Sequence, residues 1–599
     1  MQTKAPQASM SDRDVRRLGG RRPSMYLVVF GVWIATVLWF GEVLVDLVRA
    51  GDTWWIRAMT MYFVLFVSIA WLYGIYNLSV IAFATLHRKR MKRRPQPPLA
   101  SPALTTIPPV AVLYTTYNDF SEDAARTCVD LNYPDMTVYL LDDSTDPVYK
   151  RRVDSFAALH PGVQVVRREN RTGFKAGNLN HALDTVVDQP YFVVVDADER
   201  LPSDFLARLV PRIEADETLG FIQANHRSMQ DGELLQRDMY VGVDVHWKWY
   251  QPLRNQYGFV MFLGHGAILR RDAWTAAGGF PHLVSEDLAF AIAAREQGYV
   301  GAFAEDVVCL EEFPDSVRNF RRRHVKWSRG TAEFLDHYVG RLLRSRRMTT
   351  AEKLDILLPT VNLPLTLCFF LFMFIAGVAL PIAAGEAQAM TVDLRLTSFQ
   401  VPVFRLPASF DALHRWDLYA VTLLTILSPV MAFALDLWRT PIKLGRFLVR
   451  STALYATLAP LTAIAVIGYI TTKKAQFIVT GDRSGTSDGA TTVAAAGPMA
   501  RLRTFMETTN PDSRAMHRAE YAMAGILILG AVLTLQLALI GLGVGYAVAT
   551  RMHRVGWASS GMRKLTWAPA LGITTSTMLS SASLVGVQPA LFGMAIFHF

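Results

Sequence analysis

The chain alternates between long apolar runs and stretches of mixed polarity. Near the N-terminus, residues 25–48 and 58–86 are each long and apolar enough to cross about 30 Å of hydrocarbon as helices. The pattern predicts further spans toward the C-terminus, over residues 356–385, 418–435, 521–550 and 570–597. We therefore expect three helical hairpins in a membrane.

Residues 105–345 have a different pattern of apolar and polar residues. Short β-branched runs alternate there with amphipathic helical stretches, which is typical of an α/β domain. The predicted strands are 110–116, 137–143, 163–167, 191–198, 259–269 and 299–308. Continuous apolar runs of this kind indicate a buried parallel sheet, and ligands of such sheets gather at the C-terminal ends of the strands.

The run 451–472 is harder to place, because it is long enough to span a membrane but contains Pro460. If it spans, the seven cations of 473–518 lie outside the cell, whereas an interfacial position puts the four cations of 551–564 outside. Cytoplasmic loops carry the excess of Lys and Arg, so the charge count favours the interfacial position.

These patterns divide the chain into consecutive segments. We expect a cytoplasmic tail (1–24), a membrane hairpin (25–86), a basic, proline-rich linker (87–104), the cytosolic α/β domain (105–345), a second hairpin with flanks (346–450), an interfacial helix (451–472), a loop with a cytosolic linker (473–518) and C-terminal membrane helices (519–599).

Composition and charge agree with a membrane protein. Hydrophobic residues make up 51% of the chain and charged residues 19%. The formal net charge is +10, but the cations flank apolar runs, as in RDVRRLGGRR and HRKRMKRR. This places the α/β domain in the cytosol and argues against a nucleic acid partner. The three cysteines lie far apart and are expected to be reduced, and the first span shows no cleavage site and should remain as an anchor.

Carboxylates end several of the predicted strands. Alternation along VVVDADE points Asp196 and Asp198 to one side, where both can offer oxygen ligands to Mg²⁺ or Mn²⁺. Asp142 and Asp143 follow another strand, and the weaker candidate Asp119 follows TTYN. Taken alone, each of these groups is more typical of a turn at the end of a strand than of a metal site.

Other candidates lie at a helix start and in small-residue segments. Asp287 of SEDLAF either complements the helix dipole or serves as a general base. Lys175 stands between small residues in TGFKAGNLN, and Gly264 in FLGHG permits close approach of a ligand. Taken alone, His181 and His265 are expected to be structural.

The order of the motifs is more specific than any one of them. TTYND, DDS, FKAGNLN, DAD, FLGHGAILRR, SED and RHVKW occur in this order within one α/β domain flanked by apolar runs. In this the chain resembles the processive family 2 glycosyltransferases, including bacterial cellulose synthase and the curdlan and related β-glucan synthases. The resemblance implies a GT-A type α/β fold inserted between transmembrane helices.

The resemblance also implies roles for residues. The nucleotide-binding positions would be Thr116, Tyr117, Asp143, Lys175 and Asp196. Asp196 and Asp198 would hold Mg²⁺ or Mn²⁺ with the diphosphate, and Asp287 would be the general base. The acceptor would contact Trp327, Gly264, His265 and Arg323. Phe477, Val479 and Thr480 match the F-x-V-T signature of a gating loop that follows an interfacial helix.

RHVKW departs from the family's Q-x-x-R-W. Arg323 replaces the glutamine and Lys326 the arginine, while Trp327 is retained. A lysine meets a diphosphate as a point charge without the bidentate fork of arginine, so the substrate and the linkage stay open. Lys326 is still expected to act in catalysis at the diphosphate. The neighbouring Arg321, Arg322 and Arg329 are expected to touch lipid phosphates.

The implied function is a processive, inverting transferase in the cell membrane. It would polymerise sugar from a UDP-sugar, with UDP-glucose first, into a β-glucan, and export the chain through its own membrane helices. Its partners would be the donor, the growing polysaccharide and the bilayer, and accessory export proteins or a homo-oligomer stay open. The alternatives are a β-polysaccharide of N-acetylglucosamine or mannose, a single transfer to a lipid carrier, and a catalytically idle scaffold.

Overall fold

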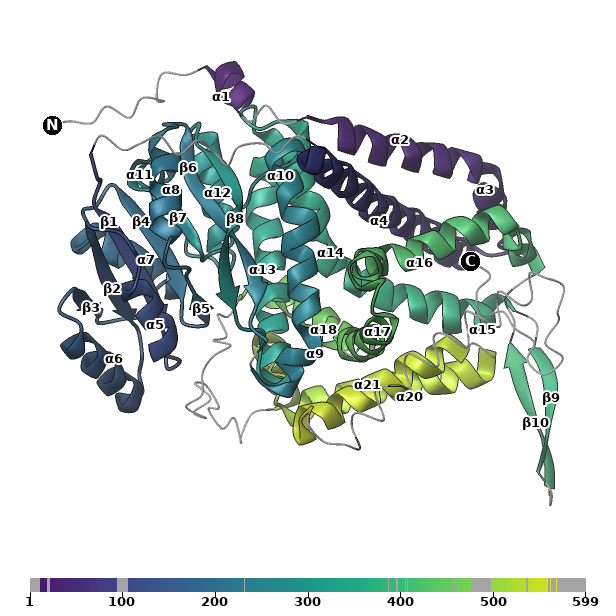
Figure 1. Cartoon of the computed structure of the whole chain (residues 1–599). Coiled ribbons are helices and arrows are strands. Elements are labelled where there is room, and N and C mark those ends of the chain that lie inside the picture. The colour runs from purple at the N-terminus through teal and green to yellow at the C-terminus, as the bar shows by residue number, and fades with distance from the viewer. Residues whose placement is uncertain are drawn as a thin grey trace.

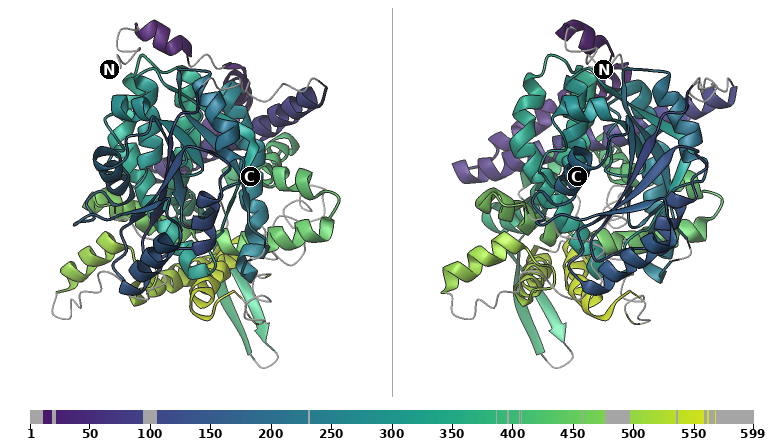
Figure 2. Two further views of the ribbon diagram at one scale, coloured as in Figure 1. Left: turned by 60° about the vertical axis from the view of Figure 1, so that its left-hand side comes forward. Right: turned by 90° about the vertical axis from the view of Figure 1, so that its left-hand side faces the viewer.

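The computed structural model describes residues 11–557 except 19–21, 94–105, 231, 386, 395–396, 405, 407, 457, 476–496 and 535–536, together with residues 561 and 567. An α/β part and a helical part lie side by side (Figure 1). Figure 2 shows the same arrangement from two further sides. This is the division that the apolar and mixed segments of the sequence predict.

The α/β part is built on an eight-stranded mixed sheet in the order β3-β2-β1-β4-β7-β6-β8-β5. β1 pairs in parallel with β2 and β4, whereas β7 runs antiparallel to both β4 and β6. The strands are β1 Val110–Thr116, β2 Met136–Asp142, β3 Val163–Val166, β4 Tyr191–Asp196, β5 Glu199–Arg200, β6 Leu219–Ser228, β7 Ala267–Arg270 and β8 Val300–Glu311.

Both faces of this sheet are buried. Along β1, Leu113 packs into one apolar core and Val112 into the other. The helices that belong to this part are α5 Glu122–Val129, α6 Pro147–Leu159, α7 Phe174–Thr185, α8 Phe205–Glu214, α9 Leu234–Val245, η1 His246–Tyr250, α10 Gln251–Tyr257, α11 Arg271–Ala277, α12 Glu286–Glu296 and α13 Val317–Arg344. The mixed sheet with helices on both faces confirms the expected GT-A type fold.

Two strand predictions need correction. The run 259–269 was expected to be one strand, but only its last residues belong to β7. Gly264 and Gly266 have φ of +88° and +60°, a left-handed backbone that interrupts a regular strand. The strand β6 was not predicted, because its second half, QANHRS, is polar. The fold nevertheless buries seven of the last eight residues of this strand.

Within the described residues, the helical part contains five helices or continuous helical stretches that are long and apolar enough to cross a membrane. They are α4 Trp54–Arg93, α14 Thr350–Phe374 continued by η2 Ile375–Ala379 and α15 Leu380–Ala384, α16 Trp416–Leu437, α17 Pro441–Ala456 with α18 Ala459–Thr472, and α20 Arg514–Thr534. A sixth candidate is the pair α2 Ser24–Trp39 and α3 Gly41–Arg49, which is bent by 52°.

The C-terminal region differs from the expected single span over 521–550. The chain forms α20 and then α21 Leu537–Val555, and the two helices lie side by side (Figure 1). A Cβ on Gly543 of α21 would lie 3.0 Å from the Ala524 carbonyl oxygen of α20. The remaining elements are α1 Asp12–Leu18, the hairpin β9 Ala387–Leu394 with β10 Thr397–Phe404, η3 Ala408–Leu413 and α19 Pro498–Thr508. The expected span 570–597 lies outside the described residues.

Helix α13 joins the two parts, because it packs against α12 on one side and against α14 and α18 on the other. The expectation that three of its arginines touch lipid is wrong. Arg321 and Arg329 have no exposed surface, and the Arg322 side chain is 15% exposed. Each has a partner from a later segment: Arg321 contacts Glu520, Arg322 contacts Asp512, and Arg329 donates to the carbonyls of Lys474 and Glu507.

Candidate functional site

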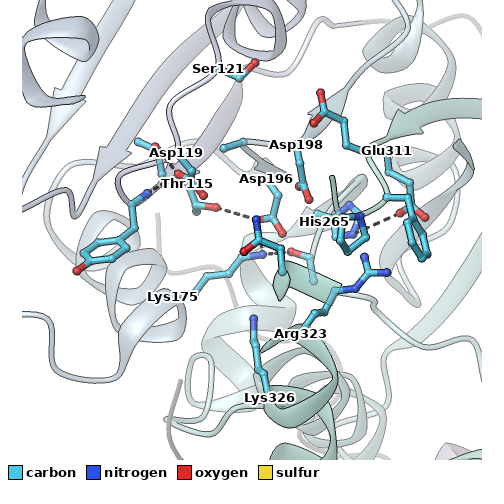
Figure 3. A pocket seen from close by; sticks show the side chains of 18 of the residues that line it. Thr115, Asp119, Ser121, Lys175, Asp196, Asp198, His265, Glu311, Arg323 and Lys326 are labelled. Atoms are coloured by element: carbon cyan, nitrogen blue, oxygen red, sulfur yellow. Dashed lines mark hydrogen bonds and ion pairs between the residues drawn. The ribbon is translucent and has the colours of Figure 1, made fainter. Parts of the chain in front are cut away.

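A cavity of about 1030 Å³ opens at the C-terminal ends of β1 and β4, between the sheet and α13. Its lining includes every predicted site residue that the structure describes: Thr116, Tyr117, Asp143, Lys175, Asp196, Asp198, Gly264, His265, Asp287, Arg323, Lys326 and Trp327. Figure 3 shows several of these side chains pointing into one space. The expected gating residues Phe477, Val479 and Thr480 lie outside the described residues.

Lys175 connects three of the motifs. Its Nζ donates to Asp196 Oδ1 over 2.5 Å and to the Gly264 carbonyl oxygen over 2.9 Å. Thr115 Oγ1 donates to the same Asp196 oxygen over 2.9 Å. Burial alone would raise the pKa of Asp196, but the charges of Lys175 and His265 outweigh it and hold this pKa below its usual value. Asp196 is therefore an ionised carboxylate in a fixed orientation.

Asp198 has a different environment from Asp196. Burial, together with the negative charge of Asp196, raises the pKa of Asp198 to about 6. Among the described residues no side chain or backbone N–H donates a hydrogen bond to its carboxylate. Carboxylate oxygens are the ligands that Mg²⁺ and Mn²⁺ prefer, and a cation would relieve the repulsion within this pair. The two carboxylates therefore fit the expected divalent metal.

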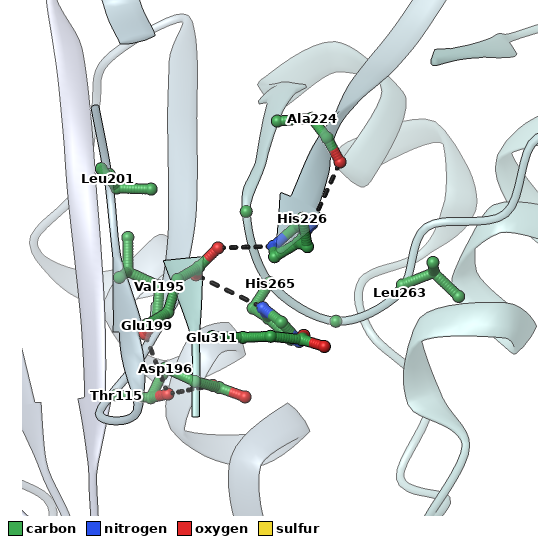
Figure 4. A network of polar contacts seen from close by, with 12 residues as sticks. Thr115, Val195, Asp196, Glu199, Leu201, Ala224, His226, Leu263, His265 and Glu311 are labelled. Carbon is green, nitrogen blue, oxygen red and sulfur yellow. Dashed lines mark hydrogen bonds and ion pairs between the residues drawn. The ribbon is translucent and has the colours of Figure 1, made fainter. Parts of the chain in front are cut away.

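Behind these carboxylates lies a second polar cluster (Figure 4). His226 Nε2 lies 2.7 Å from Glu199 Oε1, and His265 Nδ1 lies 3.4 Å from the other Glu199 oxygen. Burial lowers the pKa of His265, but Glu199 and Asp196 outweigh it and raise this pKa to about 10. His265 is thus a cation next to Asp196, which links the cluster to the cavity.

Two sets of side chains in this cluster have ligand atoms close enough to share a metal ion. They are Glu199, His226 and Cys309, and His226, His265 and Glu311. Metal-bound histidine must be neutral and metal-bound cysteine must be ionised, whereas the surroundings of His265 favour its protonated form and burial raises the pKa of Cys309. Ion pairs within the protein therefore account for this cluster, and Asp196 with Asp198 are the better candidates for the metal.

At the far end of the cavity, the β2 carboxylates meet arginines that follow β3. Arg168 Nε and Nη2 donate to the two oxygens of Asp143 over 2.8 and 2.6 Å, a bidentate pair. The Arg171 guanidinium lies 3.4 Å from the centre of the Tyr117 ring. Together these contacts form a planar, cationic pocket, a shape that suits a nucleobase and the adjoining ribose.

Asp119 is partly buried and lines the cavity next to this pocket. It accepts hydrogen bonds from Thr116 Oγ1 over 2.8 Å and from the Tyr117 N–H over 2.7 Å. Burial raises the pKa of Asp119 to about 7 despite these hydrogen bonds, with Asp198 and Asp196 adding to the effect. Asp119 thus fixes the backbone that carries Thr116 and Tyr117.

Asp287 and Glu286 stand at the start of α12, facing Lys175 and Lys326. Burial raises the pKa of Asp287, although the Leu288 N–H donates to its Oδ1 over 2.7 Å. Burial and the charge of Asp287 raise the pKa of Glu286 to about 7. Burial lowers the pKa of Lys326, and Lys175 adds to this effect while Glu286 opposes it. Asp287, a carboxylate of raised pKa, therefore lies beside the cations Lys175 and Lys326.

The α13 residues divide between two sides of the cavity. Arg323 lies near Asp198 and Glu311, and its guanidinium is 4.7 Å from the centre of the Trp327 ring. Trp327 is 48% exposed, so one face of its ring meets Arg323 while the side chain stays accessible. Lys326 points toward Glu286 and Asp287 instead.

Some lining residues were missed from sequence. Arg171 and Glu311 had signals that were available, since Arg171 stands four residues before Lys175 and Glu311 ends a strand. Tyr455 comes from α17, in the helical part, and also lines the cavity. Nothing in the local sequence of Tyr455 indicates this role.

Comparison with known families agrees with this site. Residues 191–460, from β4 into α18, match the family model described as Glycosyl transferase family group 2. This part of the chain is similar to glycosyltransferase domains, and the match supports the expected class of enzyme, a nucleotide-sugar-dependent hexosyltransferase.

Curated relatives are plant enzymes. The chain is 30% identical to glucomannan 4-beta-mannosyltransferase 1 of Oryza sativa subsp. japonica, over 37% of this chain and 44% of that protein. It is 24% identical to glucomannan 4-beta-mannosyltransferase 7 of Arabidopsis thaliana, over 64% of this chain and 76% of that protein. The chain spans about half the length of most of the curated relatives it matches. A specific resemblance to cellulose or curdlan synthase does not appear among these relatives.

Among solved structures, the mannosyltransferase PcManGT from Pyrobaculum calidifontis, in complex with GDP-Man and Mn²⁺, aligns with a TM-score of 0.38 and 21% identity. The alignment covers 68% of this chain and 99% of that chain. S. aureus TarS 1–349 in complex with UDP-GlcNAc aligns with a TM-score of 0.31 and 15% identity, over 60% of this chain and 87% of that chain.

Proposed function

We propose that this protein is an inverting, metal-dependent hexosyltransferase that extends a β-linked polysaccharide from a nucleoside diphosphate sugar. The observation that carries the proposal is the single cavity in which the pair Asp196 and Asp198 faces Asp287 and Lys326. A carboxylate pair for a metal-bound diphosphate and a separate carboxylate of raised pKa are the two groups that such a transfer requires.

The donor would lie along the ends of β1 and β4. The cationic pocket of Tyr117, Asp143 and Arg171 would hold the nucleoside, and Lys175 would keep Asp196 ionised and oriented. A bound Mg²⁺ or Mn²⁺ would supply positive charge to the leaving diphosphate. Asp198, whose carboxylate accepts no hydrogen bond from the described residues, would be its main ligand.

Asp287 would act as the general base. Its carboxylate would take the proton of the acceptor hydroxyl while that oxygen attacks the anomeric carbon. The bond from this carbon to the diphosphate oxygen breaks on the opposite face, so the configuration inverts. The cations Lys326 and Arg323 flank the line of transfer and would stabilise the diphosphate as negative charge develops. Trp327 would offer its accessible ring to the terminal sugar of the acceptor.

The donor sugar is glucose or mannose. The motif resemblance favours UDP-glucose, whereas the curated relatives are named as glucomannan 4-beta-mannosyltransferases. GDP-mannose therefore stands beside UDP-glucose as a donor, with a β-linked mannan or glucomannan as the product. The replacement of arginine by Lys326 removes a bidentate diphosphate contact, and this change bears on donor choice.

The apolar helices supply the setting for a polymer. Five of them are long enough to cross a membrane, and Tyr455 from the helical part lines the catalytic cavity. Cations flank the apolar run of α4, so we propose that the α/β part faces the cytosol and that the polysaccharide leaves between the helices. Processive synthesis and export are part of this proposal.

The experiment is synthesis by the purified protein in lipid nanodiscs. Radiolabelled UDP-glucose, GDP-mannose and UDP-N-acetylglucosamine would each be supplied with Mg²⁺ or Mn²⁺, and linkage-specific hydrolases would identify the product. We expect a high-mass β-linked polymer from one of the first two donors. Release of a lipid-linked product of one or two sugars would select a single-transfer enzyme instead.

The variant Asp287→Asn separates catalysis from an idle scaffold. We expect it to abolish turnover while the protein still binds the nucleoside diphosphate. Unchanged turnover in this variant, or no product from any donor with the wild-type protein, would contradict the proposal.

A further inference from the structure

A second cavity, of about 580 Å³, lies between α9 and α17, away from the catalytic cavity. Its lining contains five cations, Arg237, Arg439, Lys443, Arg446 and Arg450, and one carboxylate, Asp238. Five positive charges and one negative charge leave a net charge of +4 in one small cavity. Such a concentration of like charge creates a positive potential that favours the binding of an anion.

The single carboxylate is already paired. Asp238 Oδ1 accepts from Arg450 Nη1, and its Oδ2 accepts from Trp557 Nε1 over 2.8 Å. Arg450 and Asp238 therefore neutralise one another. The remaining four cations make no ion pair with a carboxylate in the described part of the chain.

Three of these four cations make contacts with neutral groups, which position them without cancelling their charge. Lys443 Nζ donates to Tyr240 Oη, and Arg237 Nε donates to the Gly232 carbonyl over 2.9 Å. The Arg439 guanidinium lies 5.0 Å from the centre of the Trp438 ring. Arg446 makes no hydrogen bond to any described residue and is exposed.

The position of the cavity identifies the kind of anion. It follows α16, one of the helices that are long enough to span a membrane, and α17 begins there. Asp436, at this end of α16, accepts from Lys248 Nζ over 2.6 Å and from Trp249 Nε1 over 3.1 Å, both in η1 of the α/β part. This end of α16 therefore lies on the side of the α/β part.

Apolar side chains border the same cations. Trp438 is 67% exposed and Ile442 is 78% exposed. Exposed tryptophan and isoleucine beside several cations, at the end of an apolar helix, is the arrangement of a membrane interface, where aromatic rings sit at headgroup level and cations meet lipid phosphates. A soluble phosphate would make no favourable contact with these apolar side chains, whereas a lipid would.

We propose that this cavity binds the phosphate-bearing headgroup of an anionic membrane lipid. Lys443, Arg446 and Arg439 contact the phosphate, and Trp438 and Ile442 contact the acyl chains. The site rests on the membrane placement in the proposed function but not on its chemistry. The same helix α17 carries Tyr455 to the catalytic cavity, so a bound lipid fixes one wall of the active site.

The test uses the full-length protein in phosphatidylcholine nanodiscs with and without phosphatidylglycerol. Native mass spectrometry counts the phosphatidylglycerol molecules that remain bound. In Lys443→Gln/Arg446→Gln we expect the affinity to fall by about tenfold or more, because each cation near a headgroup contributes about one factor of five. The matched control Lys150→Gln/Arg151→Gln removes two cations from α6 in the α/β part and should retain the lipid.

Three results would overturn the assignment. They are equal lipid retention in both double variants, displacement of the bound lipid by millimolar inorganic phosphate, which would mark a soluble phosphate site, and no preference for phosphatidylglycerol over phosphatidylcholine in the wild-type protein. Because the measurement is of binding, it stands whether or not any sugar donor is turned over.

Discussion

Lys175 Nζ lies 2.5 Å from Asp196 Oδ1, and this ion pair joins the first turn of α7 to the end of β4. The same nitrogen donates to the Gly264 carbonyl, so three motifs that are separate in sequence meet at one lysine. The pair sets the ionisation of Asp196 and holds the loop that faces Asp287. The catalytic cavity therefore depends on Lys175 for its electrostatics and for its shape.

Replacing Lys175 by methionine removes this positive charge while keeping most of the side-chain volume. We expect kcat/KM to fall by roughly 100-fold, because an aligned charge contact near the reacting groups is lost. Lys175→Arg should recover part of the activity. The control Lys150→Met, on α6, should leave kcat/KM unchanged, and an equal loss in both methionine variants would contradict a role for the ion pair.

The pH dependence follows from the raised pKa values at the start of α12. Asp287 must be ionised to accept a proton, and burial raises its pKa, so kcat/KM should fall as pH decreases through that value. Burial and the charge of Asp287 raise the pKa of Glu286 to about 7, so Glu286 is still protonated where Asp287 ionises. Glu286→Gln should therefore leave the acid limb of the pH–rate profile in place. A large shift of the acid limb in this variant would contradict this order of ionisation.

Gly264→Ala should impair turnover more than stability. Its φ of +88° makes any other residue strained, by about 1–2 kcal/mol, and its new Cβ would lie 3.3 Å from Asp287 Oδ2. We expect kcat to fall by up to about 100-fold, since small displacements of a reacting group have effects of this size.

Gly278→Ala is the matched control for this substitution. Gly278 has φ of +81°, and a Cβ there meets no atom within 4 Å. Both variants should show a similar loss of thermal stability, but only Gly264→Ala should lose turnover. Equal kcat values for the two variants would show that the space around Gly264 is not needed.

Removal of the metal should abolish activity, and Asp198 should contribute most to the affinity of the protein for the metal. Chelation by EDTA should stop turnover, and added Mn²⁺ should restore it. In Asp198→Asn the Kd for Mn²⁺, measured by electron paramagnetic resonance, should rise by more than about tenfold. Because protons compete for Asp198, Mn²⁺ affinity in the wild-type protein should also weaken as pH falls through about 6. Asp204→Asn, at the start of α8, should leave the Kd unchanged.

Arg321 and Glu520 form a fully buried ion pair between α13 and α20. Arg321→Met leaves the Glu520 carboxylate buried without its partner, so the free energy of unfolding should fall by about 3–5 kcal/mol. The double variant Arg321→Met/Glu520→Gln should recover much of this loss. Arg322→Met is the neighbouring control. It should lower the free energy of unfolding by less, because Asp512 keeps Arg318 as a partner. Thermal unfolding in detergent measures all three.

Much of the fold was accessible from periodicity alone. The strands β1, β2, β3 and β4 fall within a residue or two of their expected bounds, and β1, β2 and β4 are mostly apolar runs buried on both faces. Strand β6 was not predicted, because the polar residues of its second half are buried by neighbours that a local sequence pattern does not reveal. The expected strand 259–269 failed for a local reason, the left-handed glycines of FLGHG.

The candidate site followed a similar division. Asp196, Asp198 and Asp287 were found because carboxylates at strand and helix ends are visible in the sequence, and the structure brings all three to one cavity. Arg171 was overlooked although it stands beside the Lys175 motif. Tyr455 had no local signal at all, because its place in the cavity depends on how α17 packs against the α/β part.

The segment RRRHVKWSRG shows what each level of structure decides. Its sequence by itself determined a positively charged helix beside apolar spans, since charge and periodicity are local properties. Only the tertiary structure decided where each cation goes: Arg321 to Glu520, Arg323 to the ring of Trp327, Lys326 toward Asp287, and Arg329 to the carbonyls near 474 and 507. These partners lie up to 199 residues away, and an ion pair forms where packing brings opposite charges out of water together.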